Sequence, residues 1–229
     1  MKKLILLTLF LLPLLTFSQI QLGSDIDGEA SNDKSGRSVS IDSDGSHVAI
    51  GAYYNDGNGN DAGHVRVYSW DGSAWNQVGN DIDGEAASDY SGYSVSIDSD
   101  GSHVAIGAYY NAGNGYDAGH VRIYSWDGST WNQVGNDIDG EADDDQSGRS
   151  VSIDSDGSHV AIGAINNDGG GSNSGHVRIY EYSSGSWTQV GNEIDGTKGS
   201  WTIQEGEDDL YLLNRKNGKK YRFKLEEIT

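Results

Sequence analysis

Pairs of aspartates two residues apart are the clearest candidates for chemistry in this sequence. They lie in three copies of Ile-Asp-Ser-Asp-Gly, at Asp42 and Asp44, Asp98 and Asp100, and Asp154 and Asp156. Calcium takes about six to eight oxygen ligands, which two carboxylates with carbonyls and waters can supply. The same residues suit a tight turn, in which Asp oxygens accept bonds from nearby N–H groups. No twelve-residue loop of the EF-hand type surrounds them, so the turn is favoured and calcium is the alternative.

A second acidic segment, Asp25-Ile26-Asp27-Gly28-Glu29, recurs at 81–85 and 137–141. It places three carboxylates within five residues, and charges of one sign at this spacing repel unless water or a cation lies between them. A solvated acidic loop is the favoured interpretation, and a bridging cation is the alternative.

His and Trp residues recur in the same way. His47 and His64, with their counterparts at 103, 120, 159 and 176, could bind metal, but each pair falls on two different predicted strands. A structural role is favoured for them. The pairs Trp70 with Trp75 and Trp126 with Trp131 could stack on sugar rings, but large aromatics packed between sheets are the favoured interpretation.

All of these residues belong to a repeat of 56 residues. Residues 21–76, 77–132 and 133–188 align without a gap, and a fourth copy begins at 189 and departs after Gly196. The first two copies agree at 46 of 56 positions. Such regularity is typical of architectures in which one unit is stacked on the next.

Alternating apolar residues within each copy predict four short strands, at about 37–42, 46–54, 63–70 and 74–82 in the first copy. Turns rich in Gly, Asn and Asp separate them. Four antiparallel strands in tandem copies predict an all-β propeller built from 56-residue blades. A β-solenoid is the alternative.

The segment SGRSVSIDSDGSHVAIGAYYNDGNG, which begins at Ser35, resembles the FG-GAP repeat of integrin alpha propellers, and in particular its bacterial secreted variants. The resemblance covers about residues 21–196. It implies a propeller, a binding role and calcium as the associated ion.

Three blades are fewer than the roughly four to eight of closed propellers. Strands are predicted at 201–205, 209–214 and 221–226, the last two joined by a turn at Asn217-Gly218, and 20–25 matches the fourth strand of a blade. Together they could form a fourth blade that closes the ring. Alternatively, 197–229 is a separate β segment, and a homo-oligomer would then complete the structure.

Composition narrows the class of protein. The chain has 229 residues and a formal net charge of −20, which argues against a nucleic-acid partner. It has no Cys, so disulfides, zinc–thiolate sites and a cysteine nucleophile are excluded. Lys2 and Lys3 precede an apolar segment over 4–17, which predicts a signal peptide at 1–18 and a secreted or cell-surface protein without a membrane span.

Positions that differ between the first two copies cluster in two connections, around 31–37 and 56–60, which an up-and-down blade places at one end. Tyr and Arg are common anchors of binding surfaces. This end is therefore the predicted ligand-binding face, and drift in tolerant loops is the alternative. Its candidate residues are Lys34, Arg37, Tyr90, Tyr93, Tyr116 and Arg149.

Near-identical copies offer few unique polar residues, whereas an enzyme needs an asymmetric set of catalytic groups. We therefore expect no catalysis, and a binding or adhesion module for an extracellular protein or polysaccharide. One alternative is a structural or assembly repeat without a specific ligand. The other is a glycan-active propeller enzyme, which would need two carboxylates about 5–10 Å apart.

Overall fold

The computed structural model describes residues 20–196 and three further strands at 201–205, 210–214 and 220–223. The predicted signal peptide and the Asn217-Gly218 turn lie outside these residues. The described residues form strands and turns, and no helix that is long and apolar enough to cross a membrane is found among them.

The first repeat forms an antiparallel sheet in the order β1-β2-β3-β4, and β5 also pairs with β3. The predicted strand at 74–82 is two short strands, because the chain leaves the edge of β3 after Gln77 and returns to its other end at Ile82. The strands are β1 (Ser38–Ile41), β2 (His47–Ala52), β3 (His64–Trp70), β4 (Trp75–Gln77) and β5 (Ile82–Asp83).

The second and third repeats form equivalent sheets. The second contains β6 (Ser94–Ile97), β7 (His103–Ala108), β8 (His120–Trp126), β9 (Trp131–Gln133) and β10 (Ile138–Asp139). The third contains β11 (Ser147–Ile153), β12 (His159–Ala164), β13 (His176–Ser183), β14 (Ser186–Gln189) and β15 (Ile194–Asp195).

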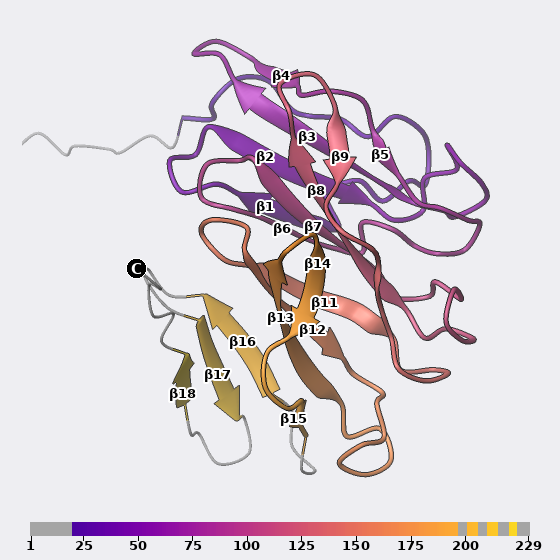
Figure 1. Ribbon diagram of the computed structural model, residues 1–229. Helices are drawn as coiled ribbons and strands as arrows, with labels where there is room; N and C mark the ends of the chain where they lie inside the picture. Colours follow the sequence, from indigo (N-terminus) through magenta and orange to yellow (C-terminus); the bar gives the residue numbers. More distant parts are fainter. Residues whose placement is uncertain (1–19, 197–200, 206–209, 215–219, 224–229) are drawn as a thin grey trace, which may run out of the picture.

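The three sheets follow one another face to face, with β1, β6 and β11 as neighbours (Figure 1). Val65 and Val67 of the first sheet pack against Ile97 and Ile106 of the second. The opposite face of the second sheet packs against the third in the same way, with Ile123 in that core. These sheets are the blades of an all-β repeat propeller, which confirms the predicted fold class.

Trp side chains close the outer part of both interfaces, as the sequence indicated. Trp131 is 9% exposed, and its Nε1 donates a hydrogen bond to the carbonyl of Val78 in the preceding blade at 2.8 Å. Trp187 bonds the Val134 carbonyl in the same way. Aromatic burial between the blades contributes to their cohesion.

Polar contacts between blades repeat with the period of the sequence. Ser38 Oγ donates to the Gly92 carbonyl at 2.7 Å, and Ser94 Oγ donates to the Gly148 carbonyl at the same distance. Gly51 is required at this contact, because a Cβ there would overlap the carbonyl oxygen of Gly92. Each blade therefore approaches the next through its backbone.

The outer face of β1 is not covered by a preceding blade. Val39 is 62% exposed and Ile41 is 60% exposed. Their counterparts in the second blade, Val95 and Ile97, are 9% and 6% exposed. The stack therefore ends on an apolar strand.

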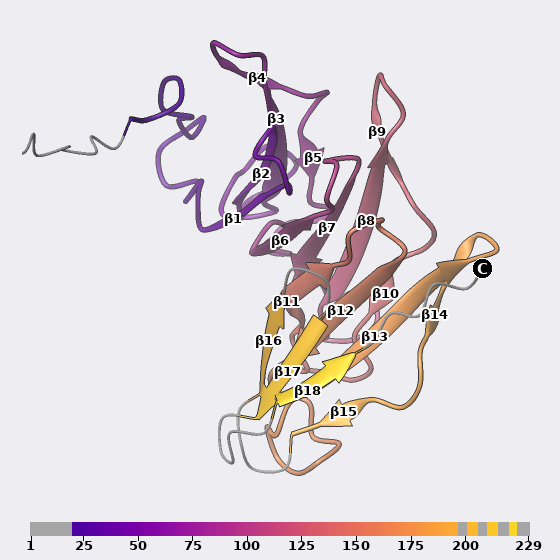
Figure 2. The ribbon, with the colours of Figure 1, turned by 90° about the vertical axis from the view of Figure 1, so that its left-hand side faces the viewer.

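The C-terminal strands β16 (Trp201–Glu205), β17 (Leu210–Asn214) and β18 (Lys220–Phe223) form a separate sheet in that order. This sheet lies beside the third blade (Figures 1 and 2). The predicted fourth blade with an N-terminal strand is wrong, because residues 20–25 form no strand. They instead follow the edge of the first blade, where the Trp75 Nε1 donates to the Leu22 carbonyl at 3.2 Å.

Candidate functional site: a tyrosine–arginine surface

The variable connections of neighbouring blades lie together at one end of the stack. The amide of Tyr90, in the second blade, donates to the carbonyl of Asp61 in the first at 3.2 Å. The amide of Gln146, in the third blade, donates to the carbonyl of Asp117 in the second at 3.1 Å. Backbone hydrogen bonds between blades thus fix the relative positions of these loops.

The backbone of these loops repeats, but the side chains on it do not. Lys34, Tyr90 and Gln146 occupy equivalent positions and have φ values of 57°, 57° and 55°. A positive φ is uncommon for residues other than Gly. The blades therefore keep one strained loop shape and present three different side chains from it.

Six tyrosines from the first two blades form a continuous cluster at this end. Tyr90 lies between the two blades, with its ring centroid 5.3 Å from that of Tyr54 and 5.2 Å from that of Tyr110. Tyr93 lies 5.4 Å from Tyr53 and 4.3 Å from Tyr109. Such spacing is favourable for aromatic pairs.

Two arginines complete the cluster. The Arg37 guanidinium lies 4.3 Å from the centroid of the Tyr93 ring and donates a hydrogen bond to the Tyr93 hydroxyl at 2.7 Å. The Arg149 guanidinium, from the third blade, lies 4.7 Å from Tyr93 and 4.6 Å from Tyr109. These contacts hold both cations against aromatic faces. We call this set the tyrosine–arginine surface: Arg37, Tyr53, Tyr54, Tyr90, Tyr93, Tyr109, Tyr110 and Arg149.

The distribution of positive charge singles out this surface. Residues 20–196 contain only six Lys and Arg residues. Arg66, Arg122 and Arg178 are buried within the blades, where each donates to a backbone carbonyl. The other three are Lys34, Arg37 and Arg149. All the basic side chains of this segment that are not buried therefore lie at the variable end.

The environment of three tyrosines in the cluster favours the neutral phenol. Burial raises the pKa of Tyr109 strongly and also raises that of Tyr90. The neighbouring Tyr53 raises the pKa of the half-buried Tyr54. Neutral phenols can both donate and accept hydrogen bonds. The surface thus combines ring faces, hydroxyl groups and guanidinium groups.

The structure brings together four of the six predicted binding residues, namely Arg37, Tyr90, Tyr93 and Arg149. Lys34 is exposed beside them. Tyr116 is 68% exposed on the adjoining loop and makes none of the ring contacts of the cluster.

The sequence analysis did not include Tyr53, Tyr54, Tyr109 and Tyr110, because the Tyr-Tyr pair is identical in the first two copies. A signal was present in the third copy, where Ile165 and Asn166 replace the pair. The cluster is consequently asymmetric although the repeats are similar.

The predicted metal-binding aspartates lie in turns and are engaged by their own blades. Asp42 Oδ2 accepts hydrogen bonds from Ser46 Oγ at 3.0 Å and lies 2.8 Å from His47 Nδ1. Asp44 Oδ1 accepts from the Ser46 amide at 2.9 Å. The same contacts recur around Asp98 and Asp100, and around Asp154 and Asp156.

Acidic and His groups that could hold a metal ion occur in the described residues, and Asp154 with Asp156 and His159 is one of them. Calcium as the ion at the three turns stays a prediction. His103 also has a structural role, because it lies beneath Gly157 of the next blade. The bond to Asp98 raises the pKa of His103, and the bond to Asp154 raises that of His159.

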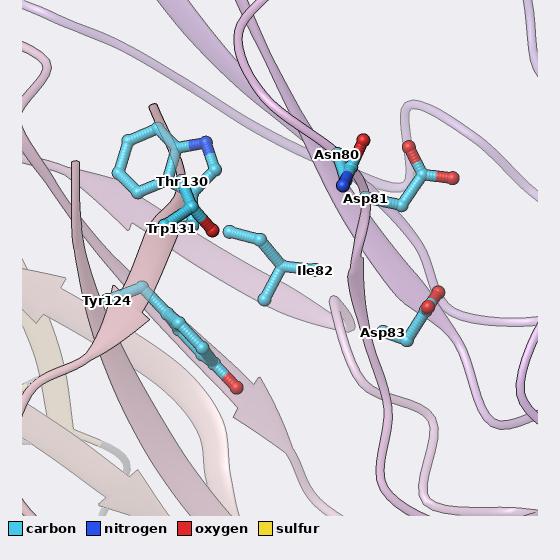
Figure 3. Close-up of a pocket in the computed structure, with 7 residues that line it drawn as sticks. All are labelled: Asn80, Asp81, Ile82, Asp83, Tyr124, Thr130 and Trp131. Carbon is cyan, nitrogen blue, oxygen red and sulfur yellow. The ribbon is translucent and has the colours of Figure 1, made fainter. Parts of the chain in front are cut away.

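A pocket of about 150 Å³ lies between the first two blades. Ile82 points toward Tyr124 and Trp131 in this pocket, whereas Asp81 and Asp83 point the other way (Figure 3). The pocket is thus a small gap between blades with a mixed polar and apolar lining.

Comparison with known proteins identifies the repeat. Residues 25–68 and 82–124, in the first two blades, match the family model of the FG-GAP repeat. This confirms the resemblance found in the sequence. No curated protein matches the chain.

Three similar solved structures are enzymes by name. Two are putative 6-phosphogluconolactonases, from Bacteroides fragilis (14% identity, TM-score 0.48) and Bacteroides uniformis (11% identity, TM-score 0.40). The third is the periplasmic gluconolactonase of Pseudomonas aeruginosa (14% identity, TM-score 0.40). The matches cover 70%, 82% and 78% of this chain, and 39%, 70% and 64% of those chains respectively.

The expectation that the protein has no catalytic activity is corrected by this finding, since the similar structures carry the names of lactonases. The expectation was based on the near identity of the repeats. The tyrosine–arginine surface shows that the repeats nevertheless form an asymmetric set of side chains. Identities of 11–14% concern the fold and assign no substrate to this chain.

Proposed function

We propose that the protein binds an anionic sugar derivative through the tyrosine–arginine surface. The observation that carries this proposal is the gathering of every basic side chain of residues 20–196 that is not buried around six tyrosines. Carboxylate groups on the ligand would pair with the guanidinium groups. Ring faces of the sugar would lie on the tyrosines, and its hydroxyl groups would bond the phenols.

Within residues 20–196, the Lys and Arg side chains that are not buried and could attract such a ligand lie at this end. The remaining surface of residues 20–196 is dominated by Asp and Glu, which repel an anion. A sugar chain bearing carboxylates would therefore be oriented by repulsion elsewhere and attraction here. We further propose that the protein meets this ligand outside the cytoplasm, as the basic and apolar N-terminal segment predicts.

The first experiment measures binding of polygalacturonate fragments to the purified protein by calorimetry. The fully methyl-esterified fragments serve as the matched ligand, because they keep the sugar rings and lose the charges. We expect the charged form to bind more tightly. Tyr93→Ala should weaken this binding about 30-fold, since truncation of a central anchor costs about 2 kcal/mol.

Tyr116→Ala is the matched control, because this exposed tyrosine lies at the same end and outside the cluster. It should bind as the natural protein does. Equal binding by the Tyr93→Ala and natural proteins would refute the proposal, as would a lack of preference for the charged fragments.

The same proteins should be tested with gluconolactone and its 6-phosphate, which are sugar derivatives that match the names of the similar structures. Hydrolysis above the spontaneous rate that is lost in Arg149→Met would make the surface an active site. Hydrolysis that persists in both Arg149→Met and Tyr93→Ala would place the activity elsewhere and would count against the proposal.

A further inference from the structure

A buried histidine faces two carboxylates at the same position in every blade. His64, at the start of β3, lies near Glu29 from the preceding connection and Asp81 from the following one. The equivalent groups are His120 with Glu85 and Asp137, and His176 with Glu141 and Glu193. In each group, one ligand atom from every residue lies within 4.8 Å of the others. We call these the histidine–carboxylate groups.

The distances within these groups do not fit hydrogen bonds. The histidine Nδ1 lies 3.8 and 3.6 Å from the two carboxylates in the first blade, 3.8 and 3.5 Å in the second, and 3.6 and 3.8 Å in the third. Hydrogen bonds between N–H and O are about 2.7–3.2 Å long. Ligands around a tetrahedral zinc ion with bonds of about 2.1 Å are about 3.4 Å apart, which is close to the observed spacing.

The histidines are buried, and at least one ring nitrogen of each has no hydrogen-bond partner. Each side chain is only 1% exposed, and the Nε2 atoms of His64, His120 and His176 have no hydrogen-bond partner. In the third blade, the Nδ1 of His176 also lacks a partner, and this is the nitrogen that faces Glu141 and Glu193. Buried polar groups without partners are rare, so this atom indicates an unfilled ligand position.

The charges around each group favour a cation. In the first blade Glu29, Asp81 and Asp83 surround His64. Two arginines lie nearby: the Arg66 Nη1 is 3.7 Å from Glu29 Oε1, and Arg122 of the second blade donates to the Asp83 carbonyl at 2.7 Å. Glu29 therefore presents one oxygen to Arg66 and the other to the histidine.

We propose that each blade binds one first-row divalent transition metal ion, such as Zn²⁺, through its histidine–carboxylate group. A neutral imidazole with two carboxylates suits such an ion better than calcium, which prefers oxygen ligands alone. The four carboxylates of the first two groups are 28–44% exposed, so they can adjust to the ion. The histidine–carboxylate groups share no residue with the aspartate turns or with the tyrosine–arginine surface.

The ion would also join parts of the chain that are far apart in sequence. Glu29 precedes strand β1, His64 is the first residue of β3, and Asp81 lies between β4 and β5. A metal held by all three would fix the entry and exit of a blade to its third strand. It would thus act as a cross-link in a protein that has no Cys.

The test is a calorimetric titration of the metal-free protein with Zn²⁺, with circular dichroism to check each variant's fold. We expect three sites, one per histidine–carboxylate group. The variants His64→Gln, His120→Gln and His176→Gln should each lose one equivalent. Glu29→Gln should lose the same equivalent as His64→Gln, and its side chain is exposed enough that folding is preserved.

His103→Gln is the matched control, because this histidine also lies near carboxylates but in an aspartate turn. It should keep all three equivalents. Tetrahedral absorption on replacement by Co²⁺ should decrease by one third in each of the other histidine variants. Zinc binding with unchanged stoichiometry in His176→Gln and Glu29→Gln, or the absence of zinc binding, would overturn the proposal.

Discussion

Strands β1 and β6 have the same sequence, Ser-Val-Ser-Ile, and very different surroundings. In β6 the apolar side chains Val95 and Ile97 are buried against the first blade. In β1 the equivalent Val39 and Ile41 are more than half exposed, although the pairing of both strands with their own blades is identical. The contrast shows that pairing within a blade is enough to form the strand, whereas burial of its apolar side chains requires the preceding blade.

The largest expected effect comes from truncating the buried member of this pair. Ile97→Ala should destabilise the protein by about 2–5 kcal/mol, because it removes apolar contacts and leaves a cavity between two blades. Ile41→Ala should change the free energy of unfolding by about 0.5 kcal/mol or less, since the side chain is mostly exposed. Urea denaturation of both variants checks the difference. Equal losses would mean that a partner covers β1 in solution.

A smaller effect is expected where blades touch through their backbones. Gly107→Ala should destabilise by about 1–3 kcal/mol, because the new Cβ would overlap the carbonyl oxygen of Gly148 in the next blade. At the equivalent position in the third blade, the Cβ of Gly163→Ala would meet only side-chain and backbone atoms of Ser150. We expect Gly163→Ala to cost clearly less in the same denaturation assay. If its cost matched that of Gly107→Ala, the contact between blades would not be the cause.

The smallest effect belongs to turns that no neighbouring blade covers. Hydrogen bonds from Ser129 and the Thr130 amide lower the pKa of Asp127 to about 2. Since the pKa is depressed in the folded state, the bonds contribute stability above the unfolded value of about 3.9. This contribution is lost as the pH falls toward 2. The stability difference between the natural protein and Asp127→Asn should therefore shrink between pH 5 and pH 2.

Asp71→Asn should behave like Asp127→Asn, because hydrogen bonds with Ala74 and Ser73 also lower the pKa of Asp71. Both turns are exposed, so position in the stack should not matter. A pH dependence that differs between the two variants would show that the neighbouring blades do influence these turns.

The sequence predicted what depends on local patterns. Alternating apolar residues and turn residues located the four strands of each blade. The sequence also favoured a turn at Asp42, with calcium as the alternative, and in the structure the Asp42 carboxylate contacts Ser46 and His47 of its own turn. The short strand β5 was missed, because two residues carry too little periodicity to separate them from a loop.

Features that depend on contact between distant segments could not be predicted. Glu29 and His64 are 35 residues apart in the sequence and belong to different motifs, and only the fold brings them near Asp81. Similarly, Tyr53 and Tyr109 are identical in two copies, so comparison of the copies hid them. Their role becomes visible only when two blades and Arg149 of a third are packed together.

The period of the contacts between blades has a genetic consequence. Ser43 Oγ bonds the Ser99 carbonyl, Ser99 bonds Ser155, and each partner lies one repeat further along the chain. Unequal recombination between near-identical copies would add or delete one unit and leave every remaining junction of the same kind. The number of blades can therefore change in a single event without redesign of the protein, which is a route to variants of different length.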